Sequence, residues 1–317
     1  MTSTIPTTRM NFAVTIRSSC SFPVGSPSVI VMLLPGFPSK SILTYRHTLR
    51  EFLFMLRKIF FLSLLFLFPA MGLKASDDLS PVVVELFTSQ GCSSCPAAEE
   101  LFSTWGMNAF KKHQIIPLAF HVDYWNSLGW KDPFSSTDAT ARQEHYAATF
   151  KSDSLYTPQM VVSGKSAFVG SDRRRAEEAL ARFANINSTL RIKINPSWEN
   201  GSIRFPVLAE SKEGLGKNIK FLVMAVIFEN GLVTEVLRGE NAGRTLNNDF
   251  VVRAFAAAGT FDPGASSKFS KILELSWDPG WKKENSGLVV FLQNQETLET
   301  GPSVCFFPLN RLGQAAS

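Results

Sequence analysis

Residues 81–96 read PVVVELFTSQGCSSCP, and this stretch decides the fold expected for the chain. The apolar, β-branched run at 82–87 predicts a strand, and the polar residues after it predict a loop. Pro96 suits the first turn of a helix, so we expect Cys92 and Cys95 at the amino end of that helix. A thiol there faces unpaired backbone N–H groups and the positive end of the helix dipole, which favour its thiolate form.

The residues after this helix predict a compact α/β unit over 80–187. A second apolar run at 115–122 predicts a strand, and strand, helix and strand in this order are typical of a parallel βαβ unit. A loop rich in Trp, Gly and Pro then leads to an inserted helix at 136–150. The strands at 156–162 and 167–169 predict a hairpin, and apolar residues at helical spacing predict a helix at 173–186.

Beyond residue 187 the pattern changes to alternating strand-like runs, which predict a second domain at 188–310. Asn-Gly pairs at 200–201 and 230–231 are strong hairpin signals between such runs. We therefore expect a mainly antiparallel, β-sandwich-like C-terminal domain. The expected strands cover residues 190–194, 202–208, 219–229, 231–238, 271–277 and 287–293.

The charge of the chain is concentrated at its N-terminus. The 317 residues carry a formal net charge of +5, but residues 1–75 hold eight of the 32 Lys and Arg and a single acid, Glu51. The remaining 24 basic and 26 acidic residues nearly cancel. The folded part therefore has no electrostatic footprint for nucleic acid.

Residues 55–75 have the order of a secretory signal peptide: Arg57 and Lys58, an apolar run to Phe68, then Pro69 and small residues. The run is shorter than the ~20 residues of a membrane span, which favours a cleaved signal over an uncleaved signal anchor. Residues 1–54 form an extension that is non-native or disordered if translation starts at Met55, and an acid-poor transit peptide is the alternative. We expect a periplasmic or secreted protein, in contact with a membrane only through an uncleaved signal.

Export bears on the cysteines, because disulfides persist outside the cytosol. In such a chain Cys92 is the candidate nucleophile, and Cys95, one turn later, the resolving thiol. A static disulfide and a thiophilic metal site formed by Cys92, Cys95 and His121 are the alternatives. Cys305 reads best as a buried apolar thiol.

The stretch 82–96 resembles the active-site strand and motif of thioredoxins and glutaredoxins, and Thr157-Pro158 resembles the proline turn of that fold. The resemblance implies a cis proline beside the cysteines, with Thr157 and Pro158 in a substrate groove. It also implies an α/β thioredoxin-like domain with a helical insertion.

A closer resemblance rests on five segments: FTSQGCSSCP, HVDYWNSLGWKDPF, ARQEHYA, YTPQMVVSG with FVGSD, and LRGENAGRTLNNDFVVRAF. Together they resemble the bacterial family catalogued as domain of unknown function 1223, over about Pro81 to Leu309. This resemblance implies a secreted or periplasmic thioredoxin-like domain with a β-rich extension and names no substrate.

Further candidate residues lie on the same segments. Glu85 sits near the position of the buried carboxylate of thioredoxins, so we consider it as a general base for Cys95 or as a solvated strand residue. His121 and Asp123 are candidates for a proton relay, the alternative being a structural histidine. Tyr124 and Trp125 would form an aromatic wall for a peptide or pack between domains.

The leading hypothesis is an exported thiol-disulfide oxidoreductase that acts on protein thiols or disulfides and exchanges electrons with a redox partner. It needs no cofactor other than the Cys92–Cys95 disulfide. The alternatives are a non-catalytic binding module, for metal delivery or partner docking, and a structural envelope protein.

Overall fold

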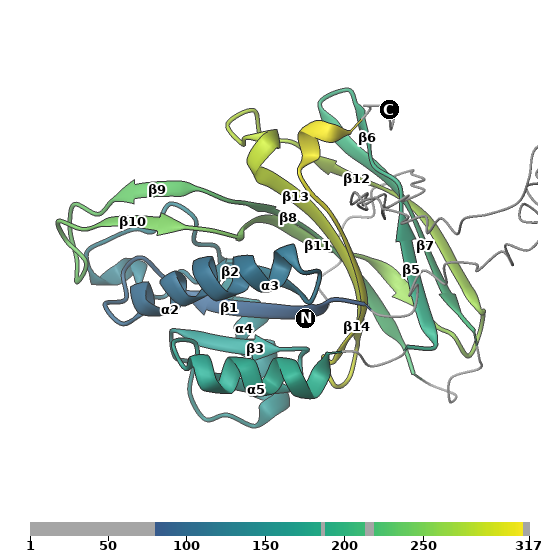
Figure 1. Cartoon of the computed structure of the whole chain (residues 1–317), viewed down its shortest axis with the longest axis horizontal. Helices are drawn as coiled ribbons and strands as arrows, with labels where there is room; N and C mark the ends of the chain where they lie inside the picture. The colour runs from purple at the N-terminus through teal and green to yellow at the C-terminus, as the bar shows by residue number, and fades with distance from the viewer. Residues whose placement is uncertain (1–79, 185–187, 213–218, 313–317) are drawn as a thin grey trace, which may run out of the picture. The chain divides into compact units, whose positions relative to one another are not determined.

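The structure is a computed structural model that describes residues 80–184, 188–212 and 219–312, all within one compact unit (Figure 1). The fold is mixed α/β with one large sheet, one smaller sheet and few helices. The N-terminal extension at 1–54 and the signal peptide at 55–75, both expected from the sequence, lie outside the described residues.

The elements follow the sequence prediction closely in the first half of the chain. The helices are α2(Cys95–Leu101), α3(Met107–Lys111), α4(Thr137–Phe150) and α5(Arg173–Phe183), and a π-helical stretch, Phe102–Gly106, joins α2 to α3. The strands are β1(Val82–Thr88), β2(Ile115–His121), β3(Gln159–Val162), β4(Ser166–Val169), β5(Leu190–Ile194), β6(Ser197–Glu199), β7(Ser202–Ser211), β8(Phe221–Glu229), β9(Leu232–Glu235), β10(Thr245–Asn248), β11(Val251–Phe261), β12(Lys268–Ser276), β13(Ser286–Asn294) and β14(Thr300–Phe306).

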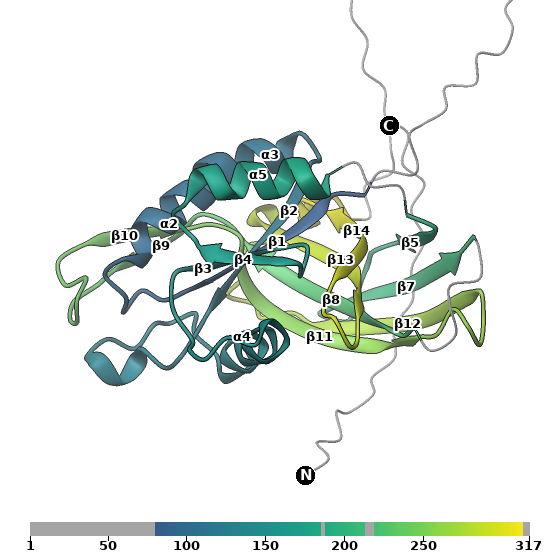
Figure 2. The ribbon, with the colours of Figure 1, turned by 90° about the horizontal axis from the view of Figure 1, so that it is seen from below.

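The large sheet has eight strands in the order β14-β13-β8-β11-β2-β1-β3-β4. β1 and β2 pair in parallel, as the βαβ prediction requires, and β3 and β4 form the predicted antiparallel hairpin. α2, α3 and α5 lie on one face of this sheet and α4 on the other (Figure 2). Because both faces are covered, every residue of β1 and of β2 is buried.

β8 and β13 belong to two hydrophobic cores at once. On β8, Met224 and Phe228 pack into the core beneath the helices, whereas the alternate residues Val223 and Ile227 pack against the smaller sheet. Strand side chains alternate between faces, so one uninterrupted apolar run serves both cores. The smaller sheet, of order β12-β7-β5, covers the second core and gives this part a sandwich-like arrangement.

The C-terminal segment enters the same sheet as the N-terminal one. β11 pairs with β2 in parallel at Val251 and Ala119, and β8, β13 and β14 continue the sheet beyond it. The change of strand pattern after residue 187 therefore marks no gap in the sheet. β11 is the longest strand that the sequence pattern missed, because its central residues 254–259, AFAAAG, include none of the β-branched residues typical of strands.

One hairpin prediction is correct and one is wrong. Asn200-Gly201 joins β6 to β7, which pair with each other. Asn230-Gly231 joins β8 to β9, which do not pair, because both edges of β8 are already occupied by β11 and β13. β9 pairs instead with β10.

Within the described ranges, no helix has the length and apolar character needed to cross a membrane.

Because both faces of β8 are buried, substitutions at two adjacent residues of this strand should both lower the free energy of unfolding. Ile227→Ala should lower the free energy of unfolding by about 2–5 kcal/mol and Phe228→Ala by about 3–5 kcal/mol, as measured by urea denaturation. The control is Val233→Ala on β9, an exposed position where about 0.5 kcal/mol or less is expected. A large cost at only one of the two β8 positions would contradict the double burial.

Candidate functional site

The loop between β1 and α2 holds the two cysteines at one end of the helix. Cys92 N–H donates to the carbonyl of Ser89 at 3.1 Å, and Cys95 N–H to the carbonyl of Cys92 at 3.2 Å. These turns place Cys92 just ahead of α2 and Cys95 at its first residue. Both are free thiols in this structure, and Ser93 and Ser94 between them are exposed.

Hydrogen-bond donors next to Cys92 favour its thiolate, whereas the backbone carbonyl of Thr157 can only accept a hydrogen bond from its thiol. Its Sγ lies 3.2 Å from Ser94 Oγ and 3.7 Å from the carbonyl oxygen of Thr157. A hydrogen bond from Cys95 and, less strongly, one from Ser94 lower the pKa of Cys92 to about 6 against the opposing effect of burial. The largest of these contributions comes from the neighbouring thiol of Cys95.

Cys95 has the opposite character. It is fully buried, and burial together with its interaction with Cys92 raises its pKa far above the usual value of a thiol. Cys305 lies apart on β14, where burial raises its pKa to about 12. The two motif cysteines therefore differ strongly in acidity, with Cys92 the one that ionises first.

The Thr157–Pro158 turn faces the cysteine loop. Its peptide bond is cis, as the resemblance to the proline turn implies. Gly170 lies against it: a Cβ on Gly170 would come within 3.2 Å of Pro158 Cβ and 3.3 Å of Ala98 Cβ in α2. The nearest contact of such a Cβ would be Leu86 Cδ1 at 2.6 Å, so a larger residue at Gly170 would force its neighbours to shift and would loosen the packing of the turn against the cysteine helix.

Glu99 is a buried carboxylate on the cysteine helix, with 6% of its surface exposed. It lies four residues after Cys95, on the same helix face. Its Oε1 accepts a hydrogen bond from Thr88 Oγ1 at 2.6 Å, and its Oε2 accepts one from Asn248 Nδ2 at 2.9 Å. Burial raises the pKa of Glu99, although the nearby His121 opposes the shift.

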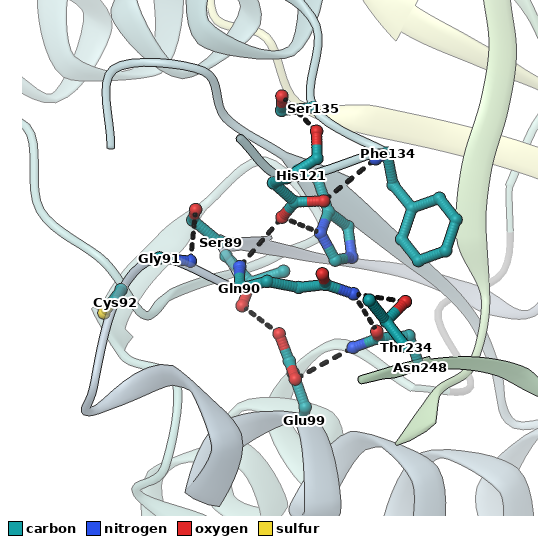
Figure 3. A network of polar contacts seen from close by, with 12 residues as sticks. Ser89, Gln90, Gly91, Cys92, Glu99, His121, Phe134, Ser135, Thr234 and Asn248 are labelled. Carbon is teal, nitrogen blue, oxygen red and sulfur yellow. Dashed lines mark hydrogen bonds and ion pairs between the residues drawn. The ribbon is translucent and has the colours of Figure 1, made fainter. Parts of the chain in front are cut away.

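His121 and Asp132 form a second buried pair next to the loop (Figure 3). His121 Nδ1 lies 2.7 Å from Asp132 Oδ2, which also accepts a hydrogen bond from the backbone N–H of Gln90 at 2.8 Å. Burial works to lower the pKa of His121, but the carboxylates of Asp132 and Glu99 outweigh it and raise the pKa. The pair thus ties the end of β2 to the residue two positions before Cys92.

A loop of the C-terminal segment is hydrogen-bonded to the cysteine loop. Asn241 Nδ2 donates to the carbonyls of Gln90 and Cys92, each at 2.9 Å, and Ser93 N–H donates to Glu240 Oε2 at 2.9 Å. Asn248, the last residue of β10, completes the contact by donating to Glu99. These residues belong to the site although they lie about 150 positions away in the sequence.

Of the other predicted site residues, the aromatic pair lies close to the cysteines. Trp125 packs against Gly91, where an added Cβ would come within 3.2 Å of Trp125 Cβ. Tyr124 is half-buried and donates to Gln143 Oε1 at 3.2 Å, and burial raises its pKa to about 12.

Glu85 and Asp123 are engaged elsewhere. Glu85 is buried, but its carboxylate pairs with Arg142 at 2.6 Å and accepts a hydrogen bond from Tyr146 at 2.7 Å. These partners are on α4, on the face of the sheet opposite α2, because Glu85 is out of phase with Thr88 along β1. Asp123 accepts a hydrogen bond from Thr140, also on α4. Neither carboxylate belongs to the cysteine site.

Five residues that contact the cysteine loop, its helix or His121 were missed from the sequence: Glu99, Asp132, Glu240, Asn241 and Asn248. The spacing of four residues from Cys95 could have indicated Glu99, because a helix face that buries the cysteine also buries that position. Asp132 and Asn241 reach the site only through the long-range arrangement of loops. The His121 partner is therefore Asp132 and not Asp123.

Cys92, Cys95 and His121, the alternative metal ligands, do not form a cluster in this structure. His121 is held by Asp132, and within the part of the chain that the structure describes no three His, Cys, Asp or Glu side chains form a metal-binding group.

Comparisons with known proteins give a family and a fold. A family model described as "Protein of unknown function (DUF1223)" matches residues 83–293. The crystal structure of protein AGR_C_4864 from Agrobacterium tumefaciens is similar, with 24% identity over 74% of this chain and 96% of that one and a TM-score of 0.54. HBP35 of Porphyromonas gingivalis is similar at 13% identity over 76% and 78% of the two chains, with a TM-score of 0.53. At these identities the likeness concerns the fold alone, and no curated protein matched the sequence.

The acidity of Cys92 can be measured directly. Thiolate absorbance near 240 nm should titrate with a pKa of about 6, and Cys95→Ala should raise that pKa because it removes the largest stabilising hydrogen bond. Alkylation by iodoacetamide should accelerate as the pH rises through the same range. Cys305→Ala is the matched control and should leave the titration unchanged, and a step that persists in Cys92→Ala would contradict the assignment.

Proposed function

Because the chain belongs to the family described as protein of unknown function DUF1223, we propose its function from its own cysteine site: thiol-disulfide exchange with exported proteins, on a thioredoxin-like core. The observation that carries this proposal is the contrast between the two motif thiols. Cys92 has its pKa lowered to about 6, whereas burial keeps the neighbouring Cys95 protonated. A pair with one ionised and one protected thiol suits attack by the first and resolution by the second.

The thioredoxin-like assignment is supported by the order and contacts of the first elements. β1, the cysteine loop, α2 and the parallel β2 are followed by the β3–β4 hairpin, and the turn before β3 faces Cys92. The Thr157 carbonyl, 3.7 Å from Cys92 Sγ, offers backbone to an extended segment of a partner. Tyr124 and Trp125 would flank that segment.

The proposed reaction consists of two successive thiol-disulfide exchanges. The Cys92 thiolate attacks one sulfur of a partner disulfide, the partner S–S bond breaks, and the other partner sulfur leaves as a thiolate. The Cys95 thiolate then attacks Cys92 Sγ, the mixed disulfide breaks, and the second partner sulfur leaves. The partner gains two electrons, and the chain is left with a Cys92–Cys95 disulfide; the reverse sequence oxidises a partner dithiol.

Glu99 and Thr88 are suited to take the proton that Cys95 must lose before the second step. The Thr88 hydroxyl acts on the Cys95 thiol, lowering its pKa against the effect of burial. The same hydroxyl donates to Glu99 Oε1 at 2.6 Å. A proton from Cys95 can thus pass to Thr88 Oγ1 while the Thr88 proton passes to Glu99, whose raised pKa suits an acceptor.

Access to Cys92 requires a small movement, because only 1% of its surface is exposed. The hydroxyl of Ser94, an exposed residue, lies 3.2 Å from its sulfur. In the proposed exchange this side chain rotates to admit the partner sulfur, while the hydrogen bonds from Asn241 continue to hold the loop. The proposed setting is an exported compartment, where partner disulfides persist.

Trapping experiments test the exchange. At pH 8, Cys95→Ala should accumulate a mixed disulfide with insulin, a disulfide-containing protein, because Cys92 can attack but nothing resolves the adduct. Wild type should reduce insulin when dithiothreitol regenerates its thiols, and Cys92→Ala should form no adduct. Equal adduct formation in Cys92→Ala, or wild type that leaves insulin disulfides intact, would sink the proposal.

The proton path predicts a slower second step. Glu99→Gln and Thr88→Val should slow release of the mixed disulfide by about 10²-fold, the usual scale of general base catalysis, with the first step unchanged. Quenched-flow separation of the two steps provides the measurement. Thr88→Ser keeps the hydroxyl and is the matched control; a Thr88→Ser variant as slow as Thr88→Val would point to packing rather than proton transfer.

A further inference from the structure

A cavity of about 440 Å³ lies beside the cysteine site, at the carboxyl end of β2. Its wall combines His121 of β2, Phe134 from the following loop, the first turn of α4, Arg253 and Phe255 of β11, and Trp281. The volume falls in the range of sites for small ligands. Of these cavity residues, His121 and Phe134 also contact Asp132, the residue whose carboxylate accepts the backbone N–H of Gln90.

Two buried nitrogen atoms in this wall have no hydrogen-bond partner. His121 Nε2 is one of them, although the His121 side chain is only 1% exposed and its other nitrogen is held by Asp132. Arg253 Nη1 is the second, while Arg253 Nε lies 3.6 Å from Glu229. Buried donors without partners cost free energy, so each is a point where a ligand oxygen would be stabilising.

Both nitrogen-bearing groups lie against the same aromatic ring. The His121 ring meets Phe134 edge-on with centroids 5.5 Å apart, and Arg253 Cζ lies 5.1 Å from the centroid of Phe134. Arg253 also lies over the Trp281 ring, at 5.6 Å. The two donors are therefore positioned around one apolar surface, as in a site for a ligand with a polar end and an apolar body.

The charge around the two donors favours an anion. The carboxylate of Asp132 raises the pKa of His121 and so favours the imidazolium form, in which Nδ1 donates to Asp132 and Nε2 is a second donor. The first turn of the 14-residue α4 also lines the cavity and contributes the positive end of its dipole. Asp138 and Asp278, the acids of the lining, are both exposed, and the buried Glu229 is engaged by Arg253 and by Lys282 N–H.

We propose that this cavity binds a small carboxylate, with the carboxylate oxygens on His121 Nε2 and Arg253 Nη1 and the apolar body among Phe134, Phe255 and Trp281. The site is distinct from the exchange site, because it uses no sulfur and no residue of the Cys92 loop. A carboxylate matches two N–H donors and a cation in a way that a neutral amide does not.

Calorimetric titration of the full chain with benzoate, and with benzamide as the neutral isostere, tests the proposal. Benzoate should bind saturably with one molecule per chain, and benzamide about tenfold more weakly or worse, the effect of losing a charge-assisted contact. Arg253→Met and His121→Asn should each weaken benzoate binding by about tenfold or more. Asp278→Asn, at the rim, is the matched control and should leave the affinity equal or higher.

A second readout guards against variants that fail to fold. In wild-type protein, benzoate and not benzamide should raise the pKa of the His121 imidazole followed by NMR, because the bound anion favours the charged ring. Equal affinity for benzoate and benzamide, absence of saturable benzoate binding, or an unchanged His121 titration would overturn the proposal. The outcome does not depend on exchange activity, so Cys92→Ala should bind benzoate as wild type does.

Discussion

The arrangement of the whole molecule depends on the joint between β2 and β11. Ala119 N–H donates to the carbonyl of Phe250 at 2.8 Å, and Val251 is paired with Ala119 in parallel. This short contact inserts the C-terminal strands into the sheet that carries the cysteines. As a result Asn248 reaches Glu99 and Asn241 reaches the cysteine loop from one side of the joint, and Arg253 reaches the cavity at His121 from the other.

The joint is stabilised by burial on both sides of the strands that follow it. β8 and β13 alternate between the core beneath the helices and the core beneath the smaller sheet. Both hydrophobic cores depend on these strands, because β8 and β13 each contribute side chains to the two cores. The loops that clasp the cysteines are therefore fixed by apolar packing some distance away, while their own contacts to the site are hydrogen bonds.

Local signals predicted the parts of the fold that are set within short stretches of sequence. The β1–loop–α2 order, the hairpin of β3 and β4 and the position of α4 follow from periodicity, turn residues and Pro96. β11 escaped prediction because its Ala-rich sequence gains strand character only from neighbours on both edges. In the site, Cys92 and Cys95 were found from their spacing, but Glu85 was predicted as the nearby carboxylate and the structure has Glu99 there instead. The side chain of Glu85 points to the opposite face of the sheet from α2, because side chains alternate between faces along β1.

The central claim is that Cys92 and Cys95 form one reversible redox pair, in which the pKa of the first is lowered and that of the second is raised by burial. Equilibration in glutathione buffers of graded potential, followed by acid quenching and peptide mass spectrometry, tests it most directly. The account predicts a reversible loss of two hydrogens confined to the peptide that contains Cys92 and Cys95, with Cys305 unmodified throughout. A Cys92 that is only glutathionylated, with Cys95 reduced at every potential, would contradict it.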